Sequence, residues 1–341
     1  MTATAKKECV VFPVLYLDFG CFPVAEPAEN NAVPPKPVKK GKNDTMKYIL
    51  GPMKLPFLIL TPMCILVGIS TAMWSGANVS AIRIFLIVVG AVCSHISVNA
   101  LNEYHDFKSG LDSRTERTPF SGGSGTLQER PDKATAALAT GIISLLLCFS
   151  IGMYFVFTVG IMLLPLGLLG IALIVFYTRW ITKRPIICLI APGLAFGPLM
   201  VLGTHFVLAG SYSLTAFVAS LVPGFLVSDL LLLNQFPDVE ADKTVGRKHL
   251  PILLGRKNVA RIYVLFLAAS YMPIIIGYLL GIFPIHAFIA LATIVLAVKT
   301  SRGVLRYSDE IKNLVPYLGK NVIIDLATPA LLAIGFMIAS R

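Results

Sequence analysis

The feature that most constrains this chain is a series of long apolar segments separated by short polar ones. A helix needs about 20 apolar residues to cross a bilayer, and nine segments are that long or close to it. They lie at residues 55–74, 80–101, 133–157, 159–178, 186–209, 213–233, 258–280, 283–299 and 319–339. The alternating pattern of a transmembrane β-barrel does not occur. We therefore predict an all-α polytopic membrane protein with nine transmembrane helices.

The composition supports this prediction. Charged residues make up 14% of the chain and its mean hydropathy is +0.77, whereas soluble domains carry about 25% charged residues. A cytosolic globular enzyme, a nucleic-acid-binding protein and a disordered chain are therefore disfavoured, despite a net charge of +11. The six cysteines form no Cys-x-x-Cys pair, so neither a disulfide framework nor a cysteine metal site is indicated.

The basic residues fall in alternate polar segments. All but Arg83 and Arg341 of the 29 Lys and Arg residues lie in five regions, at residues 1–54, 108–133, 179–184, 243–261 and 299–320. Cytoplasmic loops of membrane proteins are enriched in Lys and Arg. With nine helices, this pattern predicts a cytoplasmic N-terminus and a C-terminus on the opposite side of the membrane.

The N-terminal segment differs from the rest of the chain. Residues 1–53 are rich in Pro and Lys, and residues 36–42 are strongly basic. No run of small residues typical of a cleavage site follows the apolar part, which disfavours a signal peptide. We expect a flexible cytoplasmic segment whose basic residues face anionic lipid, followed by a transmembrane domain at residues 54–341.

Two clusters of acidic and amide residues follow the second and sixth apolar segments. The first contains Asn102 and Asp106, and the second contains Asn234, Asp238 and Asp242. Residues four apart lie on one face of a helix. We therefore expect each cluster to project from a helix end into one polar mouth, and the two clusters to be halves of an internal repeat.

Crowded carboxylates repel one another unless a positive charge neutralises them. A divalent cation with oxygen ligands would do so, and Mg²⁺ leaves coordination positions for water and phosphate. Two clusters could hold two ions around one diphosphate. Solvated helix caps are the alternative, but the Asn-x-x-x-Asp pattern occurs twice on the same predicted side. The candidate metal ligands are Asp106, Asp112, Asp238 and Asp242.

Basic and glycine-rich residues flank these clusters. Residues 121–126 read Ser-Gly-Gly-Ser-Gly-Thr, and such a segment is either a flexible loop or an anion-binding loop. The candidate diphosphate-binding residues are Lys183, Arg179, Arg117 and Lys248. Lys183 and Arg179 are favoured because they follow a third helix on the same side.

The two motifs resemble those of the UbiA superfamily of intramembrane prenyltransferases. The first reads Asn102-Glu103-Tyr104-His105-Asp106 and continues to Asp112, and the second reads Asn234-Gln235-Phe236-Pro237-Asp238-Val239-Glu240-Ala241-Asp242. The menaquinone branch, which prenylates dihydroxynaphthoate, is the most similar, through Tyr104, Gly110, Asp112 and Phe196-Gly197-Pro198-Leu199. Glu103 stands where the usual motif has Asp, and the usual Thr-Gly-Gly-Pro after the Tyr of the fourth helix is missing at Tyr177.

The resemblance implies a UbiA-type bundle that transfers a prenyl group from a prenyl diphosphate to an aromatic acceptor. The four aspartates would bind Mg²⁺, as two ions or replaced by Mn²⁺, with Asn102 and Asn234 in support. Tyr104, Tyr177 and Phe236 would face the allylic cation or the aromatic acceptor.

Several alternatives remain open. The chain could use another acceptor or be a terpene cyclase of the same superfamily. It could also be a repeat-built secondary transporter, or a non-catalytic lipid or quinone sensor. No nucleic-acid partner is expected, and the oligomeric state does not follow from the sequence.

Overall fold

The computed structural model describes residues 50–115 and 117–340, which form helices and turns with no strand. Eight helices are long and apolar enough to cross a membrane. They span Leu50–Trp74, Ala81–Ser109, Pro131–Thr158, Pro185–Ala209, Leu214–Asn234, Arg256–Leu279, Ile285–Tyr307 and Ile311–Ala339. The remaining predicted span, 159–178, contains only a shorter apolar helix at Ile161–Phe176. The all-helical prediction is confirmed, and most of the predicted N-terminal segment lies outside the described residues.

The individual elements subdivide these spans. In chain order they are η1 (Leu55–Ile59), α2 (Leu60–Trp74), α3 (Ala81–Ser109), α4 (Thr126–Glu129), η2 (Pro131–Lys133), α5 (Ala134–Thr158), η3 (Ile161–Leu163), α6 (Leu164–Phe176), η4 (Ile181–Lys183), α7 (Pro185–Leu194), the π-helical turn η5 (Ala195–Leu199), α8 (Met200–Ala209), α9 (Leu214–Asn234), α10 (Val239–Thr244), α11 (Leu250–Leu254), α12 (Arg256–Ala269), α13 (Met272–Leu279), η6 (Ile285–Thr293), α14 (Ile294–Tyr307) and α15 (Ile311–Ala339).

The two motifs lie on helices differently from the prediction. Helix α3 continues to Ser109 and ends at Gly110, whose φ of 71° gives the left-handed conformation common after a helix C-terminus. Asn102 and Asp106 are therefore inside α3, whereas Asp112 follows it. The second motif is not one continuous helix, because α9 ends at Asn234 and α10 starts at Val239. Pro237 lies in the intervening turn, and proline cannot donate the backbone hydrogen bond that would continue the helix.

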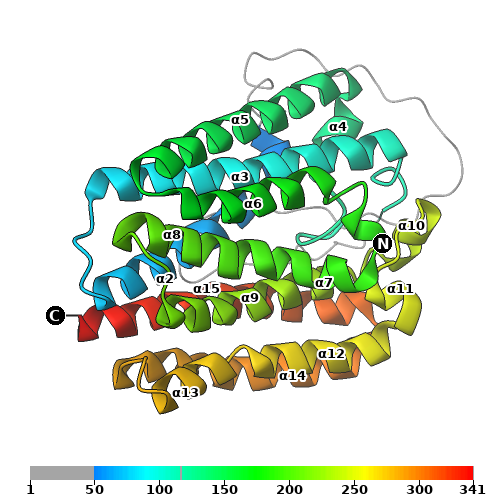
Figure 1. Ribbon diagram of the computed structural model, residues 1–341. Helices are drawn as coiled ribbons and strands as arrows, with labels where there is room; N and C mark the ends of the chain where they lie inside the picture. The colour runs from blue at the N-terminus through cyan, green and yellow to red at the C-terminus, as the bar shows by residue number, and fades with distance from the viewer. Residues whose placement is uncertain (1–49, 116, 341) are drawn as a thin grey trace, which may run out of the picture. The chain divides into compact units, whose positions relative to one another are not determined.

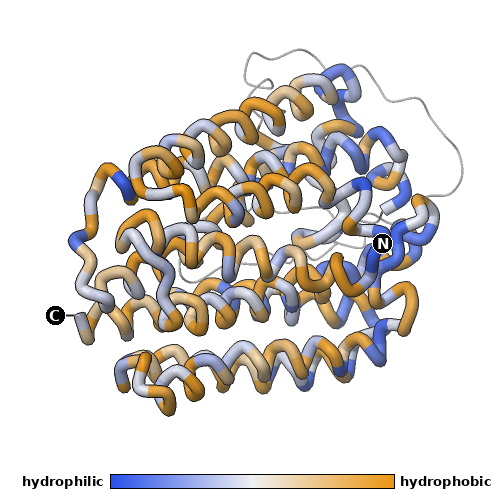
Figure 2. Tube along the Cα trace, viewed as in Figure 1, coloured by the Kyte–Doolittle hydropathy of each residue, from blue (hydrophilic) through white to orange (hydrophobic). Residues whose placement is uncertain are grey.

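Helix α9 packs against more of the bundle than a peripheral span would. It contacts α2, α7, α8, α12, α13 and α15, whereas α3 packs mainly on α5. Figure 1 shows the long helices running in similar directions, with α4, α10 and α11 together at one end and the end of α15 at the other. Hydrophilic residues gather at the end that holds α4, α10 and α11 (Figure 2). The apolar helices thus present one polar end, where both motifs lie.

Glycines allow the long helices Pro185–Ala209 and Leu214–Asn234 to approach closely. A Cβ added at Gly197 would lie 2.5 Å from the Ser220 carbonyl oxygen and 2.6 Å from the Gly224 Cα. At Gly193 it would lie 2.1 Å from the Gly224 carbonyl oxygen. Small residues at helix interfaces let backbones meet in this way. This contact fixes α7 and η5 against α9, whose end carries Asn234.

A polar network also ties two spans together inside the bundle. The Tyr263 hydroxyl of α12 donates to Asn321 Oδ1 at 2.7 Å, and Asn321 Nδ2 donates to Asp325 at 3.0 Å on α15. All three side chains are buried. Hydrogen bonds between apolar helices contribute to their association in a membrane.

Replacing Gly197 by Ala should destabilise the protein by about 1–3 kcal/mol, the usual cost of overpacking a well-packed contact. The unfolding midpoint in detergent measures the effect. Gly152→Ala on α5 is the matched control, because no heavy atom lies within 4 Å of the added Cβ. Equal midpoints for the two variants would contradict the close α7–α9 contact.

Candidate functional site

The first cluster combines the last turns of α3 with the segment that follows. Asp106 and Asp112 are both buried. Burial raises the pKa of Asp112 to about 7, with further contributions from the carboxylates of Glu103 and Asp106. Asp112 Oδ2 is buried and has no hydrogen-bond partner in the described part of the chain. The cluster therefore concentrates negative charge that favours a cation.

The second cluster lies on the turn after α9 and on α10. Asp242 is buried, and Asp238 precedes the first residue of α10. Burial raises the pKa of Asp238 to about 7, and the nearby Asp242 carboxylate raises it further, while a hydrogen bond from Ser121 opposes the shift. Within residues 50–115 and 117–340, one oxygen each of Asn234 and Asp238 is buried without a partner.

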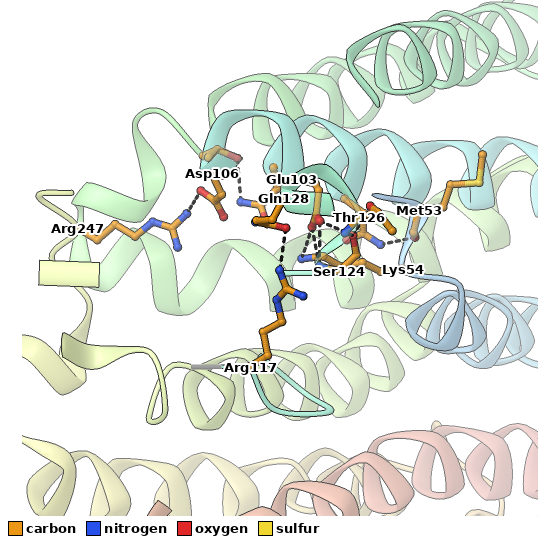
Figure 3. Close-up of polar contacts among 12 residues, drawn as sticks. Met53, Lys54, Glu103, Asp106, Arg117, Ser124, Thr126, Gln128 and Arg247 are labelled. Carbon is orange, nitrogen blue, oxygen red and sulfur yellow. Dashed lines mark hydrogen bonds and ion pairs between the residues drawn. The ribbon is translucent and has the colours of Figure 1, made fainter. Parts of the chain in front are cut away.

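Arg247 joins the two clusters. Its guanidinium forms an ion pair with Asp106 through Nη2, and its Nη1 donates to Asp242 Oδ1 at 3.0 Å. Burial alone would lower the pKa of Arg247, but the two carboxylates raise it above its usual value. His249 Nδ1 lies 3.0 Å from Asp242 Oδ2. Residues 141 positions apart in sequence therefore meet in one polar site, as Figure 3 shows for Arg247 and Asp106.

The glycine-rich segment 121–126 lies against both clusters. Gly122, Gly123 and Gly125 have positive φ angles of 88°, 71° and 78°. A Cβ at Gly123 would lie 2.8 Å from Asp112 Oδ1. The backbone N–H of Ser124 donates to Glu103 Oε1 at 2.9 Å. Glycine is needed here for backbone conformation and for close approach to a carboxylate.

The predicted basic residues lie around the site rather than within it. Arg117, Arg179, Lys183 and Lys248 are all exposed. Arg117 Nη2 donates to Gln128 Oε1 at 2.9 Å. The Lys248 N–H donates to the Thr182 carbonyl at 3.2 Å, which places the loop after α10 beside η4. Lys183 and Lys248 therefore occupy adjoining loops at the polar end.

The remaining predicted residues have different environments. Asn102 Nδ2 donates to Thr178 Oγ1 at 3.2 Å, between α3 and the end of α6. Tyr104 and Tyr177 are half-buried, whereas Phe236 is fully buried in the main apolar core. Phe236 packs the turn after α9, and its carbonyl accepts a hydrogen bond from Arg256 at 2.8 Å.

Arg247, Lys54 and His249 contact acidic residues of the site, but none of them is among the four candidate diphosphate-binding residues, which include Lys248. The chain offers no local signal that separates Arg247 from the adjacent Lys248. Lys54 Nζ lies 3.8 Å from Glu103 Oε2, although Lys54 precedes the first predicted span. These roles depend on contacts between distant segments, which spacing along one helix does not reveal.

The donor set suits a hard cation. Asp112, Asn234 and Asp238 each present an unpartnered buried oxygen, and Mg²⁺ prefers oxygen ligands. Among the described residues, no three His, Cys, Asp or Glu side chains are grouped to hold an ion by themselves. Mg²⁺ commonly takes one or two carboxylates and completes its shell with water and substrate phosphate, so these residues fit it.

Comparisons with known proteins place this site in context. Residues 61–317 match the UbiA prenyltransferase family. A 1,4-dihydroxy-2-naphthoate octaprenyltransferase from Bacillus subtilis is 26% identical over 238 residues, covering 69% of this chain and 75% of the relative.

Solved structures share the fold. A UbiA homologue from Aeropyrum pernix has a TM-score of 0.63 at 18% identity, covering 84% of this chain and 98% of that one. A UbiA homologue from Archaeoglobus fulgidus, bound to GPP and Mg²⁺, has a TM-score of 0.54 at 14% identity, covering 84% and 99%. Because the family match spans most of the chain and the helices are those of a multi-pass membrane protein, this chain belongs to the UbiA prenyltransferase family.

Proposed function

We propose that this intramembrane prenyltransferase transfers a prenyl group from a prenyl diphosphate to an aromatic acceptor resembling 1,4-dihydroxy-2-naphthoate. The observation that carries the proposal is the pair of buried carboxylate clusters joined by Arg247 at the polar end of an apolar bundle. The naphthoate prenyltransferase relative supports this class of acceptor. A phosphate-bearing head can enter from water at this end while its isoprenoid chain lies among apolar helices.

The proposed metal ligands are Asp106, Asp112, Asp238 and Asp242, with Asn102 and Asn234 in support. They would hold two Mg²⁺ ions, and Mn²⁺ could replace them. Binding of GPP and Mg²⁺ by the Archaeoglobus homologue supports this assignment. When bound, Mg²⁺ neutralises the negative charge of the departing diphosphate.

Arg247 is proposed to contact the diphosphate, because its guanidinium already lies between the two clusters and can hydrogen-bond to phosphate. Lys183, Arg179, Arg117 and Lys248 would supply further positive charge from the surrounding loops. Preorganised charges of this kind stabilise the leaving group as the allylic C–O bond breaks. The diphosphate keeps the electron pair of that bond, and the allylic carbon bonds to a ring carbon of the acceptor. That ring carbon then releases the group it carried, H⁺ or, at a carboxylate-bearing carbon, CO₂, which restores the aromatic ring.

Tyr104 and Tyr177 are proposed to face the allylic cation, since aromatic rings stabilise a nearby positive charge. Both are half-buried beside α3 or the end of α6. Phe236 would act by packing the turn that carries Asp238. The apolar helices would exclude water, which would otherwise capture the cation.

The topology completes the proposal. The helix Ile161–Phe176 would cross the membrane as a ninth span, with its ends extended by adjoining residues. The polar end and residues 1–53, as a flexible segment, would then face the cytoplasm, and the C-terminus would lie on the other side.

Transfer of a labelled prenyl group to 1,4-dihydroxy-2-naphthoate should require Mg²⁺ and stop in excess chelator. Asp238→Asn should lower turnover at least about 100-fold, since loss of one preorganised charge contact commonly costs about 3 kcal/mol of transition-state stabilisation. Product identification by mass spectrometry gives the readout. Lys257→Ala, at a side chain 80% exposed, is the matched control with unchanged turnover. Full turnover in chelator would contradict the metal role, and product only with other aromatic acceptors would contradict the proposed acceptor.

The stability of the metal-free protein should depend on pH. The pKa values of Asp112 and Asp238 are about 7, against 3.8 for the unperturbed group. The folded state therefore binds more protons, so its free energy of unfolding should fall as pH rises from about 4 to about 7. Thermal unfolding in chelator measures this fall, and added Mg²⁺ should reduce it. The double variant Asp112→Asn, Asp238→Asn should show a weaker dependence; the same slope in both proteins would contradict the shifts.

A cysteine at Thr244 should be labelled from the cytoplasmic side of sealed vesicles, and a cysteine at Ser211 from the opposite side. Both positions are exposed, and they lie in loops of opposite predicted sidedness. The measurement uses a membrane-impermeant thiol reagent in a cysteine-free background. Labelling of both sites from one side would overturn the topology.

A further inference from the structure

Glu103 is engaged by the protein itself rather than left available to an ion. Its carboxylate is 1% exposed. It accepts the Ser124 N–H at 2.9 Å and the Ser124 hydroxyl, and Lys54 Nζ lies 3.8 Å away. Figure 3 shows Ser124 and Lys54 beside Glu103, with Thr126 next to Ser124. These contacts come from three separate parts of the chain.

Ser124 belongs to the segment that touches both acid clusters. Gly123, directly before it, packs against the Asp112 carboxylate. Ser121 lies close enough to Asp238 to lower the pKa of its carboxyl against the effect of burial. Contacts that hold Ser124 in place therefore also restrain segment 121–126, which lies beside the carboxylates of Asp112 and Asp238.

The residues at the start of the first span also contact segment 121–126 and Glu103. Lys54 has φ 51° and ψ 54°, and it is the one non-glycine with positive φ among the described residues. Such a conformation is unfavourable for a residue with a Cβ and persists only where surrounding contacts impose it. Gly51 packs against Thr126, and the Thr126 hydroxyl lies 2.7 Å from that of Ser124. Lys54 is thus directed at Glu103 by a backbone that itself contacts the segment.

We propose that Glu103 is a positioning residue that fixes segment 121–126 between the two clusters, and is not a metal ligand. It would set the separation of Asp112 and Asp238 through Gly123 and Ser121. The inference deepens the proposed function and rests on it for its kinetic test. Two of the proposed ligands contrast with Glu103: Asp112 and Asp238 each keep an unpartnered buried oxygen, whereas Glu103 keeps none within the described residues.

The longer side chain is essential to this role. Aspartate is shorter by one methylene, about 1.5 Å, so Glu103→Asp would keep the charge and lose the reach to Ser124. Glutamine keeps the length and one carbonyl oxygen that can accept the Ser124 N–H. The two substitutions therefore separate positioning from metal binding, because a metal ligand would tolerate Asp better than Gln.

The test compares Glu103→Gln, Glu103→Asp and Ser124→Ala in the full-length protein. We expect Glu103→Gln to retain kcat within about threefold, and Glu103→Asp to lose about tenfold or more, because hydrogen bonds to a charged group are among the stronger ones. The Mg²⁺ concentration for half-maximal rate should stay unchanged in Glu103→Gln, which removes the charge of Glu103 but keeps its contact with Ser124. A larger loss in Gln than in Asp, with a raised Mg²⁺ requirement, would overturn the proposal.

Hydrogen exchange of residues 121–126 gives a readout that needs no turnover. Exchange in Mg²⁺-free buffer should be faster in Glu103→Asp and Ser124→Ala than in Glu103→Gln. Wild-type protection in both of the first two variants would overturn the proposal. If Glu103→Asp does not fold, Ser124→Ala decides by the same criterion. A wild-type protein with no prenyl transfer would refute the proposed function while leaving this exchange test valid.

Discussion

The neutralisation of buried carboxylates at one end of an apolar bundle is the constraint on which this structure depends. Asp106 and Asp242 are removed from water, and unpaired buried charges are strongly unfavourable. Arg247 contacts both, so one guanidinium holds together the end of α3 and α10. The unpartnered oxygens of Asp112, Asn234 and Asp238 lie in the same two motifs. The site thus combines charge already balanced within the chain with oxygens suited to an added cation.

The bundle supports this site by fixing where its helices end. Helix α9 is central, and the glycine contacts at Gly193 and Gly197 hold α7 and η5 against it. Asn321 connects α12 and α15 through Tyr263 and Asp325. Because apolar helices have little hydrophobic preference for one another within lipid, close packing and hydrogen bonds set their positions. Those positions decide which polar end groups can meet.

The sequence predicts the two acidic clusters of the candidate site, but it does not predict which side chains contact each other within the site. The paired Asn-x-x-x-Asp patterns located both clusters, and the structure brings Asp106 and Asp242 to the same arginine. The i, i+4 spacing from Asn234 to Asp242 does not correspond to one continuous helix, because Pro237 lies in the turn between α9 and α10 and cannot donate a backbone hydrogen bond. The ion pair of Arg247 with Asp106 and the hydrogen bond from Ser124 to Glu103 form only when segments far apart in sequence pack together. Arg247 and Lys248 are adjacent basic residues, and the sequence does not show which of the two side chains points toward the carboxylates. In the structure it is Arg247, while Lys248 is exposed.

Three features are readable from the amino-acid sequence: the chain is helical and apolar, most spans lie where hydropathy places them, and acidic and basic residues concentrate between alternate spans. Hydropathy over about 20 residues and spacing within a helix are local properties, so they can be read from the chain. Three other features become visible only in the folded chain. The helix Ile161–Phe176 is shorter than a typical span, Phe236 is buried in the apolar core, and Glu103 accepts a hydrogen bond from Ser124. These outcomes depend on contacts between segments far apart in sequence, whose geometry is set by packing of the whole bundle.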